Sequence, residues 1–282
     1  MKNSVIHSSV ALIDWGGPCR QPCPRCGRGL KDRTCGVTVD SGGNGVAHCF
    51  RCDHVETIRG GRAHGPRSIH TYQRHEEKKH STLSKYAQEL WAECLELEGV
   101  ALAYLKARQC VIPPADGHLR CHLKLKHWPS GTTGPALVAL VTHAVTGEPM
   151  SLHRTWVQAD GRKAQIDPAR MNLKDHNKAG GVVRLWPDED VTTCLGIAEG
   201  IETTLSLAHA YTPVWSLLDA GNLAAMPVLK GIQSLLIAAD NDAPGIAAAK
   251  SCATRWAGHG REVRIVRPEA PESDLNDLAR SA

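Results

Sequence analysis

Two C-x-x-C pairs separated by 22 residues constrain the fold of this chain more than any other feature. The first pair is Cys23 and Cys26, and the second is Cys49 and Cys52. A tight turn at each pair places two thiolates on one side, and two such turns on adjacent hairpins form a tetrahedral four-sulfur site. Because the surrounding segment is Gly-rich, bound metal would supply much of its folding energy. Four protein ligands leave no open position, which predicts structural Zn²⁺; a redox-active dithiol is the alternative.

Other residues that ligate metals lie close to these pairs in the sequence. They are Cys19, Cys35, His48 and His54. Cys19 is a substitute for Cys23, but the C-x-x-C spacing favours Cys23. The chain has 11 cysteines, an odd number. No signal-like segment opens it, and no apolar run approaches the roughly 20 residues of a membrane helix. We therefore expect a bacterial cytoplasmic or nucleoid protein with no membrane partner, in a reducing setting where such cysteines bind metal.

Charge is distributed unevenly along the chain. The net charge is +4, but residues 1–85 hold 14 Lys and Arg against 7 Asp and Glu, so the rest sums to −3. A basic first part and an acidic last part indicate a polyanion partner for the former and metal cations for the latter. Plain solvation of two surfaces is the alternative interpretation.

Basic residues around the cysteine pairs, with the single Phe of the chain, suit single-stranded DNA. Phosphate contacts and base stacking together hold such strands. The predicted DNA-binding residues of this segment are Arg25, Lys31, Arg33, Phe50 and Arg51, with Arg28 beside them. A solvated surface is the alternative for each.

Composition and hydrophobic periodicity divide the chain into four parts. Residues 1–60 are predicted to form a β-rich zinc ribbon, and the polar, Gly-containing residues 61–81 a flexible linker. Residues 82–190 are predicted to form a small α+β subdomain. Residues 191–282 alternate short apolar strands with helical patterns, which predicts an α/β domain with a mostly parallel sheet. The fold class expected is therefore α/β and multidomain.

The expected elements follow from the spacing of apolar residues. In the α+β part we expect a helix from Leu83, capped by Thr82 or Ser81, a helix over 100–108, and strands over 119–125, 137–142 and 152–157. In the last part we expect strands over 194–198, 214–217, 234–239 and 262–266, and helices over 201–209 and 244–256.

Acidic residues follow three of the predicted strands in the last part. Glu199 comes after 194–198, Asp240 and Asp242 come after 234–239, and Asp274 and Asp277 follow 262–266 after a loop. The carboxyl ends of parallel strands line one crevice, so these carboxylates are expected to converge. Clustered carboxylates stay ionised only with cations, and oxygen ligands suit Mg²⁺ or Mn²⁺. Taken singly, Asp240 and Asp242 have an alternative role as helix caps.

This order of motifs resembles the Toprim domain of bacterial primases, type IA and II topoisomerases and some nucleases. The matching segments are Glu199-Gly200, Asp240-Asn241-Asp242-Ala243-Pro244-Gly245 and Ser273–Leu278, over about 90 residues. The sequences of the segments Ala198–Thr203 and Ala220–Leu223 are similar to those of primases of the phage and plasmid type. A zinc ribbon ahead of the Toprim domain is also typical of that group. The last acidic motif of that family often has its carboxylates two residues apart, whereas here they are three apart.

The resemblance implies roles for the acidic residues. Glu199, Asp240 and Asp242 would bind two catalytic Mg²⁺ or Mn²⁺ ions, and Glu199 would help to activate a 3′-hydroxyl. Asp274 and Asp277 would complete the metal-binding cluster. For Glu202 and Asp219 we favour structural roles, the former early in a helix and the latter in a turn.

Basic residues of the α+β part would hold nucleotides and template by the same resemblance. The candidates are Arg120, His122, Lys124, Arg154, Lys163 and Lys174. A guanidinium suits a triphosphate, and Arg154 is preferred, then Lys174. Ordinary surface charge is the alternative for each.

The sequence is therefore interpreted as a primase that makes short RNA primers on single-stranded DNA from NTPs. No G-x-x-x-x-G-K-S/T phosphate loop occurs, so a replicative helicase is expected to act in trans. The alternatives are a metal-dependent Toprim nuclease, a topoisomerase fragment and a non-catalytic zinc-ribbon nucleic-acid binder. None of the four tyrosines stands out as a topoisomerase nucleophile.

Overall fold

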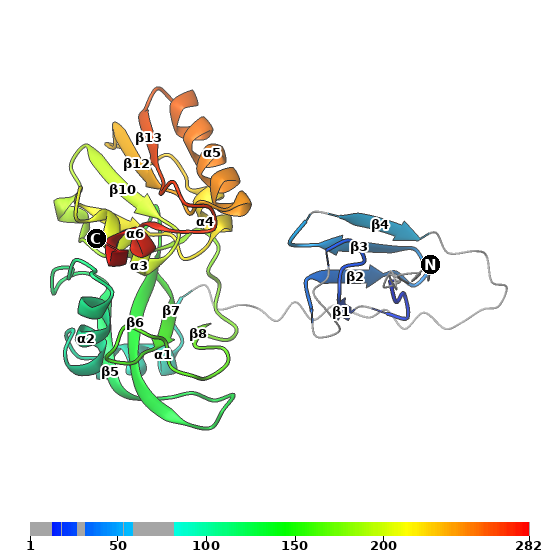
Figure 1. Ribbon diagram of the computed structural model, residues 1–282, viewed down its shortest axis with the longest axis horizontal. Coiled ribbons are helices and arrows are strands. Elements are labelled where there is room, and N and C mark those ends of the chain that lie inside the picture. The colour runs from blue at the N-terminus through cyan, green and yellow to red at the C-terminus, as the bar shows by residue number, and fades with distance from the viewer. Residues whose placement is uncertain (1–12, 18, 27–31, 53, 59–81, 282) are drawn as a thin grey trace, which may run out of the picture. The chain divides into compact units, whose positions relative to one another are not determined.

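A computed structural model describes residues 13–17, 19–26, 32–52, 54–58 and 82–281 of the chain (Figure 1). They belong to two compact units, one within residues 1–73 and the other within residues 74–282. The predicted linker over 61–81 lies outside the described residues, as do Arg28, Lys31 and Ser81.

The first unit is a four-stranded antiparallel sheet in the order β1-β2-β3-β4. Its strands are β1 (Cys19–Gln21), β2 (Cys35–Val39), β3 (Gly45–Cys49) and β4 (Val55–Ile58). A small core of Ile13, Val37 and Ala47 packs beside the four paired cysteines. So few apolar side chains bury little surface, which is why a unit of this size needs a further constraint.

The second unit is built on one continuous nine-stranded sheet. Its order is β13-β12-β10-β11-β9-β6-β7-β8, and β5 pairs with β6 off this path. The strands are β5 (Leu119–Lys126), β6 (Thr133–His143), β7 (Pro149–Trp156), β8 (Arg170–Asn172), β9 (Gly181–Arg184), β10 (Cys194–Ala198), β11 (Val214–Ser216), β12 (Ser234–Ala238) and β13 (Glu262–Val266).

Four neighbouring strands at one end of this sheet, β13, β12, β10 and β11, are parallel. The strands β10, β11 and β12 are mostly buried and are apolar runs in the sequence, as predicted, whereas the edge strand β13 is mostly exposed. Leu195 and Ile197 of β10 pack against α4 (Ala220–Ala225) and α5 (Ala243–Gly258). On the other face, α3 (Ile201–Leu207) lies so close that a Cβ at Gly196 would approach Leu207 to 3.2 Å.

The antiparallel strands β5, β6 and β7 form the other half of the sheet, with one helix on each face. The helix α1 (Lys85–Glu93) packs on Val138, Leu140 and Leu152, and α2 (Gly99–Ala107) packs on the opposite face. The long strand β6 pairs with both β7 and β9, so it joins the two halves.

Most expected elements are present, with three corrections. The predicted cap of the first helix is wrong: α1 begins after Ser84, whose Oγ accepts from the Ala87 N–H at 3.3 Å. Leu83 is buried ahead of that cap, so the helix starts later than its apolar pattern. The short helices α4 and α6 (Leu275–Ser281) were not expected, and neither were the strands β8 and β9.

Asn276 fixes the C-terminal helix α6 to α2 and α3. Its side chain is fully buried, donates to the Arg108 carbonyl (2.8 Å) and to Ser206 Oγ (3.0 Å), and accepts from Arg108 Nε (2.8 Å). The acidic loop before α6 is thereby fixed to both halves of the sheet.

We predict that Asn276→Ala lowers the free energy of unfolding by on the order of 2 kcal/mol, since it leaves buried partners without hydrogen bonds. Urea unfolding followed by Trp fluorescence measures this. Leu278→Ala on the same helix removes an exposed side chain and is expected to change stability by less than about 0.5 kcal/mol. Equal effects of the two substitutions would contradict the anchoring role.

Candidate metal centres and their cationic surroundings

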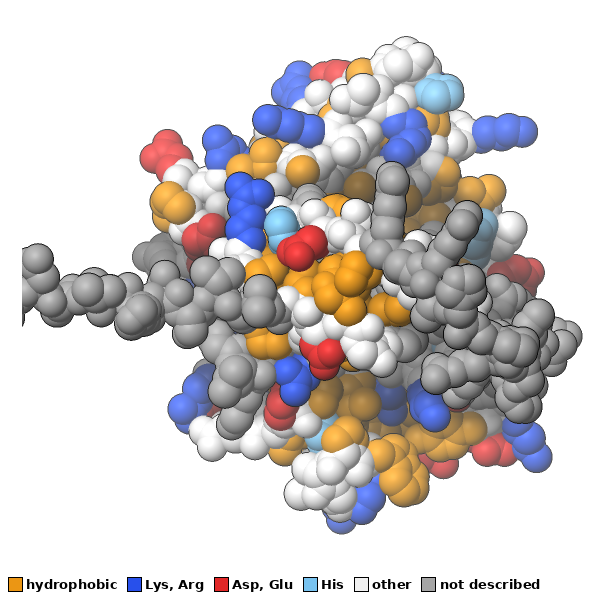
Figure 2. All heavy atoms as spheres, turned by 90° about the vertical axis from the view of Figure 1, so that its right-hand side faces the viewer, with side chains coloured by type: hydrophobic (Ala, Val, Ile, Leu, Met, Phe, Trp, Pro, Cys, Tyr) orange, Lys and Arg blue, Asp and Glu red, His pale blue; other side chains and the backbone are white. Residues whose placement is uncertain are grey.

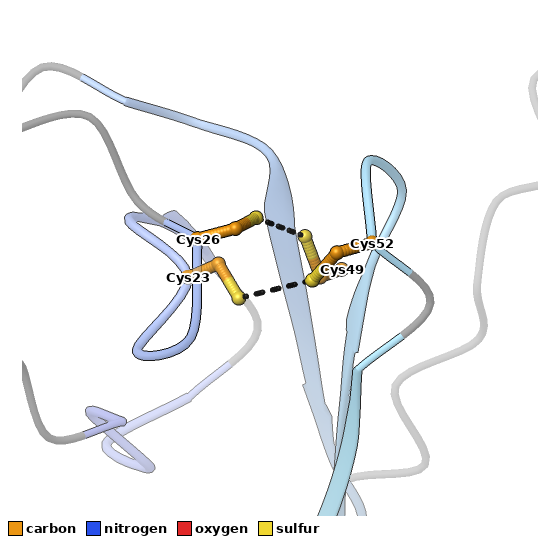
Figure 3. Close-up of side chains that lie close together, drawn as sticks. All are labelled: Cys23, Cys26, Cys49 and Cys52. Carbon is orange, nitrogen blue, oxygen red and sulfur yellow. Dashed lines mark hydrogen bonds between the residues drawn. The ribbon is translucent and has the colours of Figure 1, made fainter. Parts of the chain in front are cut away.

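The four paired cysteines converge on one point of the first unit, as Figure 3 shows. All four sulfur atoms lie within 4.8 Å of one another. Sγ of Cys26 lies 3.5 Å from that of Cys49, and Sγ of Cys23 lies 3.8 Å from that of Cys52. Tetrahedral zinc with Zn–S bonds of about 2.3 Å requires sulfurs roughly 3.8 Å apart, so the geometry fits structural Zn²⁺. Neither Cys19 nor Cys35 belongs to this cluster.

Hydrogen bonding and charge in this cluster also suit a cation. Backbone N–H groups of Arg25 and Arg51 donate to Cys23 Sγ (3.4 Å) and Cys49 Sγ (3.5 Å). Burial raises the pKa of Cys49, but backbone donors such as Arg51 outweigh it and bring that pKa to about 6. Hydrogen bonding to Cys52 and burial raise the pKa of Cys26 to about 12. The Cys49 thiol ionises readily and the Cys26 thiol resists ionisation. Four thiolates together therefore need a bound cation.

The predicted DNA-binding residues of the first unit lie in different surroundings. Phe50 is 61% exposed and lies beside the Arg20 guanidinium, 4.7 Å from the ring centroid. Arg51 donates to both oxygens of Asp32 (2.8 and 3.2 Å) and to the Cys26 carbonyl, so it ties the two cysteine turns together. Arg25 and Arg33 are exposed, and Lys31 lies outside the described residues. Arg20 was missed because it precedes the cysteine turns in the sequence.

We predict that Cys26→Ser lowers the zinc content, which is about one ion per chain for a four-sulfur site, and makes residues 13–58 sensitive to proteolysis. Cys19→Ser is the control, since Cys19 is exposed and lies outside the cluster. Atomic absorption measures the metal. A Cys19→Ser protein that loses zinc while Cys26→Ser keeps it would contradict this ligand set.

In the second unit, Glu199 and Asp240 lie at the carboxyl ends of the adjacent parallel strands β10 and β12. Burial, followed by the charge of Asp240, raises the pKa of Glu199 to about 7. Burial, followed by the charges of Asp274 and Asp242, raises the pKa of Asp240 to about 6. The strands therefore bring these carboxylates close enough to act on one another.

Asp240 also has a carboxylate oxygen whose hydrogen-bonding capacity is not satisfied. Its Oδ1 atom is buried and has no hydrogen-bond partner among the described residues. A buried carboxylate oxygen without a donor is costly, and a divalent cation at this edge would satisfy it. The residues present therefore fit Mg²⁺ or Mn²⁺, held by Glu199, Asp240 and the remaining oxygen of Asp242.

Asp242 has a second, structural task. Its Oδ1 accepts from the Gly245 N–H at 2.7 Å and caps α5, as the simpler interpretation of this motif expected. A Cβ at Gly245 would lie 2.8 Å from the Asp240 carbonyl oxygen. The glycine of the D-x-D-x-x-G motif is thus required for close approach of the helix start to the acidic turn.

Asn241, between the two acids, fixes the next acidic loop. Its Nδ2 donates to the carbonyls of Glu269 (3.1 Å) and Ala270 (2.8 Å), and its Oδ1 accepts from Arg267. These bonds hold the loop that leads to Asp274 beside the end of β12.

Asp274 and Asp277 form a reciprocal cap on α6. Asp274 Oδ1 accepts from the N–H groups of Asn276 (2.6 Å) and Asp277 (3.0 Å), and Asp277 Oδ2 accepts from the Asp274 N–H (3.3 Å). This is a capping box, which needs a spacing of three. It accounts for the spacing that departs from the related family, while the charge of both residues still reaches Asp240.

Among the described residues, the cysteines are the one group of three or more metal-ligating side chains whose ligand atoms lie within 4.8 Å of one another. The carboxylates are therefore coupled through their charges but are not closed into such a group. Their role as metal ligands stays a prediction.

The other two acids near this edge have structural partners. Asp219 caps α4 through the Asn222 N–H (2.9 Å) and pairs with Lys178 (2.8 Å). Glu202 is buried and accepts from the Tyr104 hydroxyl at 2.6 Å. Burial raises its pKa, but Lys163, Tyr104 and Arg170 outweigh this and lower it to about 2.

Two cations, Arg170 of β8 and Lys163, act on acidic residues near this edge of the sheet. Arg170 pairs across the sheet with Thr155, shares the face of His153 and acts on the charges of both Asp240 and Glu202. It is exposed and forms no ion pair with a residue that the structure describes. Lys163 acts on Glu202 in the same way. The sequence pattern did not predict Arg170 and Lys178, because neither adjoins a recognisable motif.

The remaining basic candidates lie elsewhere. Arg154 is on the opposite face of β7 from His153, under α1, and Arg120 stacks on Trp91 of α1 at 4.4 Å. His122 lies 3.5 Å from Glu93 of α1. Lys124 and Lys174 are exposed. The structure does not bring these residues together with the carboxylates.

Two protein-family models match most of the second unit. Residues 81–185 match a domain family of unknown function, DUF7146, and residues 194–282 match the Toprim domain family. The C-terminal part of the chain is a Toprim domain. A search of curated protein sequences finds no match.

Three of the solved structures to which this chain is similar are primases or primase fragments. A primase domain from Pseudomonas aeruginosa is 14% identical over 66% of this chain, with a TM-score of 0.37, and the chain spans 56% of its length. The primase fragment of the bacteriophage T7 primase-helicase is 15% identical over 93% of both chains, with a TM-score of 0.42. The zinc-binding and RNA polymerase domains of the Aquifex aeolicus primase are 14% identical over 98% of this chain and 78% of theirs, with a TM-score of 0.45.

Two further observations concern the charged side chains on one face and the ability of the helices to span a membrane. Lys and Arg side chains are interspersed with Asp and Glu on the coloured surface of the face in Figure 2. No helix of the described residues is both long and apolar enough to span a bilayer.

The raised pKa of Glu199 in the Toprim domain predicts a pH-dependent stability. Because the folded-state pKa of about 7 exceeds its ordinary value of 4.5, the folded protein binds this proton more tightly. The stabilisation is present below about pH 4.5 and is lost as pH rises through about 7. Glu199→Gln should therefore raise the unfolding free energy at pH 8, without Mg²⁺ or Mn²⁺, by on the order of 1–3 kcal/mol.

Urea unfolding of the zinc-loaded protein at pH 8 and pH 5 tests this, and the gain should shrink at pH 5. Glu189→Gln is the matched control, since Glu189 is exposed on a short 3₁₀ turn, Asp188–Asp190. A Glu199→Gln protein that is less stable than the wild type at pH 8 would show that the carboxylate is not under repulsion.

Proposed function

We propose that this protein is a DNA primase that joins NTPs into short RNA primers on single-stranded DNA. The observation that carries the proposal is Asp240. Its buried oxygen lacks a donor among the described residues, burial and then neighbouring carboxylates raise its pKa to about 6, and the charge of Arg170 acts on it. Carboxylates for metals beside cations for phosphates are what nucleotidyl transfer requires.

Each group of residues has a task in this reaction. Glu199, Asp240 and Asp242 hold Mg²⁺ or Mn²⁺, which when bound neutralises triphosphate charge and favours ionisation of the attacking 3′-hydroxyl. Arg170 and Lys178 bind phosphate oxygens of the incoming NTP or the template. Glu199, at the carboxyl end of β10, would also help to activate the 3′-hydroxyl.

The first unit, which contains the four-cysteine cluster, contributes recognition of the template. Phe50, Arg20, Arg25 and Arg33 offer a base-stacking surface and phosphate contacts to single-stranded DNA. A replicative helicase acting in trans, a bacterial cytoplasmic setting and a phage or plasmid origin remain predictions from the sequence.

A metal-dependent nuclease is the second candidate, because the same carboxylates support phosphodiester hydrolysis. The Arg170 and Lys178 side chains beside the carboxylates favour the primase, since a triphosphate substrate carries more negative charge than a single phosphodiester.

Primer synthesis on mixed single-stranded templates with labelled ATP or GTP, the other NTPs and Mg²⁺ or Mn²⁺ tests the proposal. We predict metal-dependent oligoribonucleotides, reduced by at least about 10³-fold in Asp240→Asn. Asp190→Asn, an exposed acid on the 3₁₀ turn, is expected to keep full activity. Cleavage of the template that is lost in Asp240→Asn, with no RNA product, would replace the primase by the nuclease.

A further inference from the structure

A pocket of about 630 Å³ lies beside the start of α1, on the face of β7 turned away from the carboxylates. Its lining includes Ser84, Tyr86, Trp128, Arg154, Lys174 and His176. Its volume is in the range of pockets that hold small ligands. None of the Toprim carboxylates lines it.

Arg154 is a buried cation without a carboxylate partner. The residue is 4% exposed, its Nη2 donates to the Asn172 carbonyl at 2.9 Å, and its guanidinium lies 5.7 Å from the Trp156 ring centroid. Its Nε is buried with no hydrogen-bond partner, and no described residue forms an ion pair with it. A buried charge compensated only by a carbonyl and a ring is costly, so an anion in the pocket would satisfy it.

The rest of the rim is also suited to an anion and is held in place. Lys174 is exposed at the pocket, and the N-terminal turn of α1, with its positive dipole end, begins there at Ser84. His176 accepts from the Ser84 N–H (3.2 Å), and its Nδ1 lies 2.9 Å from the Lys174 carbonyl, which makes Nδ1 the donor. The loop that carries Lys174 is thereby fixed to the helix. Asp175 also lines the pocket and is exposed.

Two aromatic rings open to solvent complete the pocket. Trp128 is 69% exposed and Tyr86 is 48% exposed. Aromatic rings beside cations are the usual platform for a nucleobase and its phosphate.

We propose that this pocket binds a nucleotide, with its phosphate on Arg154 and Lys174 and its base on Trp128 or Tyr86, as a site separate from the Toprim carboxylates. The separation follows from the strand pattern, since Arg154 and His153 lie on opposite faces of β7 and His153 shares the face of Arg170. A free mononucleotide and a terminal nucleotide of a strand offer the same chemistry. The site does not depend on primase activity.

Calorimetric titration of ATP into the full chain, in buffer without Mg²⁺ or Mn²⁺, tests the site. We expect binding that is unchanged in Asp240→Asn and weakened at least about tenfold by Trp128→Ala and by Lys174→Ala. Both of these side chains are exposed, so the variants should fold, and their melting temperatures verify it. Lys250→Ala, an exposed lysine on α5, is the control and should bind like the wild type.

Competition by a 5′-phosphorylated oligodeoxynucleotide identifies the source of the nucleotide. Displacement of ATP that requires Trp128 assigns the pocket to a strand end, and no displacement assigns it to a free nucleotide. Absence of ATP binding, or equal binding by the wild type, Trp128→Ala and Lys174→Ala, would overturn the site. Primer synthesis is measured separately, so either proposal can fail while the other stands.

Discussion

Repulsion among carboxylates at one edge of a parallel sheet is the constraint on which the second unit depends. Strands β10 and β12 end side by side, so Glu199 and Asp240 cannot separate without unpairing the sheet. Burial, and after it the neighbouring carboxylate charges, raise the pKa of Glu199 to about 7 and that of Asp240 to about 6, so holding both groups ionised there costs free energy. Strongly shifted pKa values cluster at functional sites, and the task proposed for these charges is to hold divalent cations.

The surrounding residues hold this edge in place by means other than charge pairing. Asn241 fixes the loop before Asp274, Asn276 fixes the helix after it, and Gly245 leaves room for the start of α5. The three motif segments thus contain two kinds of residue, acids proposed as metal ligands and neutral residues that place those acids. Asn222 adds a further clamp, because its side chain binds the backbone of Lys178, Gly180 and Gly181. That clamp brings Lys178 to Asp219 at the same edge.

The sequence predicts what depends on local pattern and not what depends on strand register. Buried parallel strands are short apolar runs, so β10 and β12 and the acids after them were recognisable. The cysteine turns were equally local, and their convergence is confirmed. Arg170 was not among the basic candidates because the pairing of β7 with β8, which sets the face of each side chain, leaves no local mark in the sequence. For the same reason the pairing of Arg51 with Asp32 was not visible.

The most direct test of this account is a carboxylate titration by difference infrared spectroscopy of the wild type against Glu199→Gln, with and without Mg²⁺. We predict one carboxyl group that titrates near pH 7 without Mg²⁺, is absent in Glu199→Gln, and shifts to lower pH when Mg²⁺ is added. If Glu199 titrates near its ordinary pKa of 4.5 and Mg²⁺ leaves that pKa unchanged, the carboxylates are neither crowded nor a metal site, and the central claim is wrong.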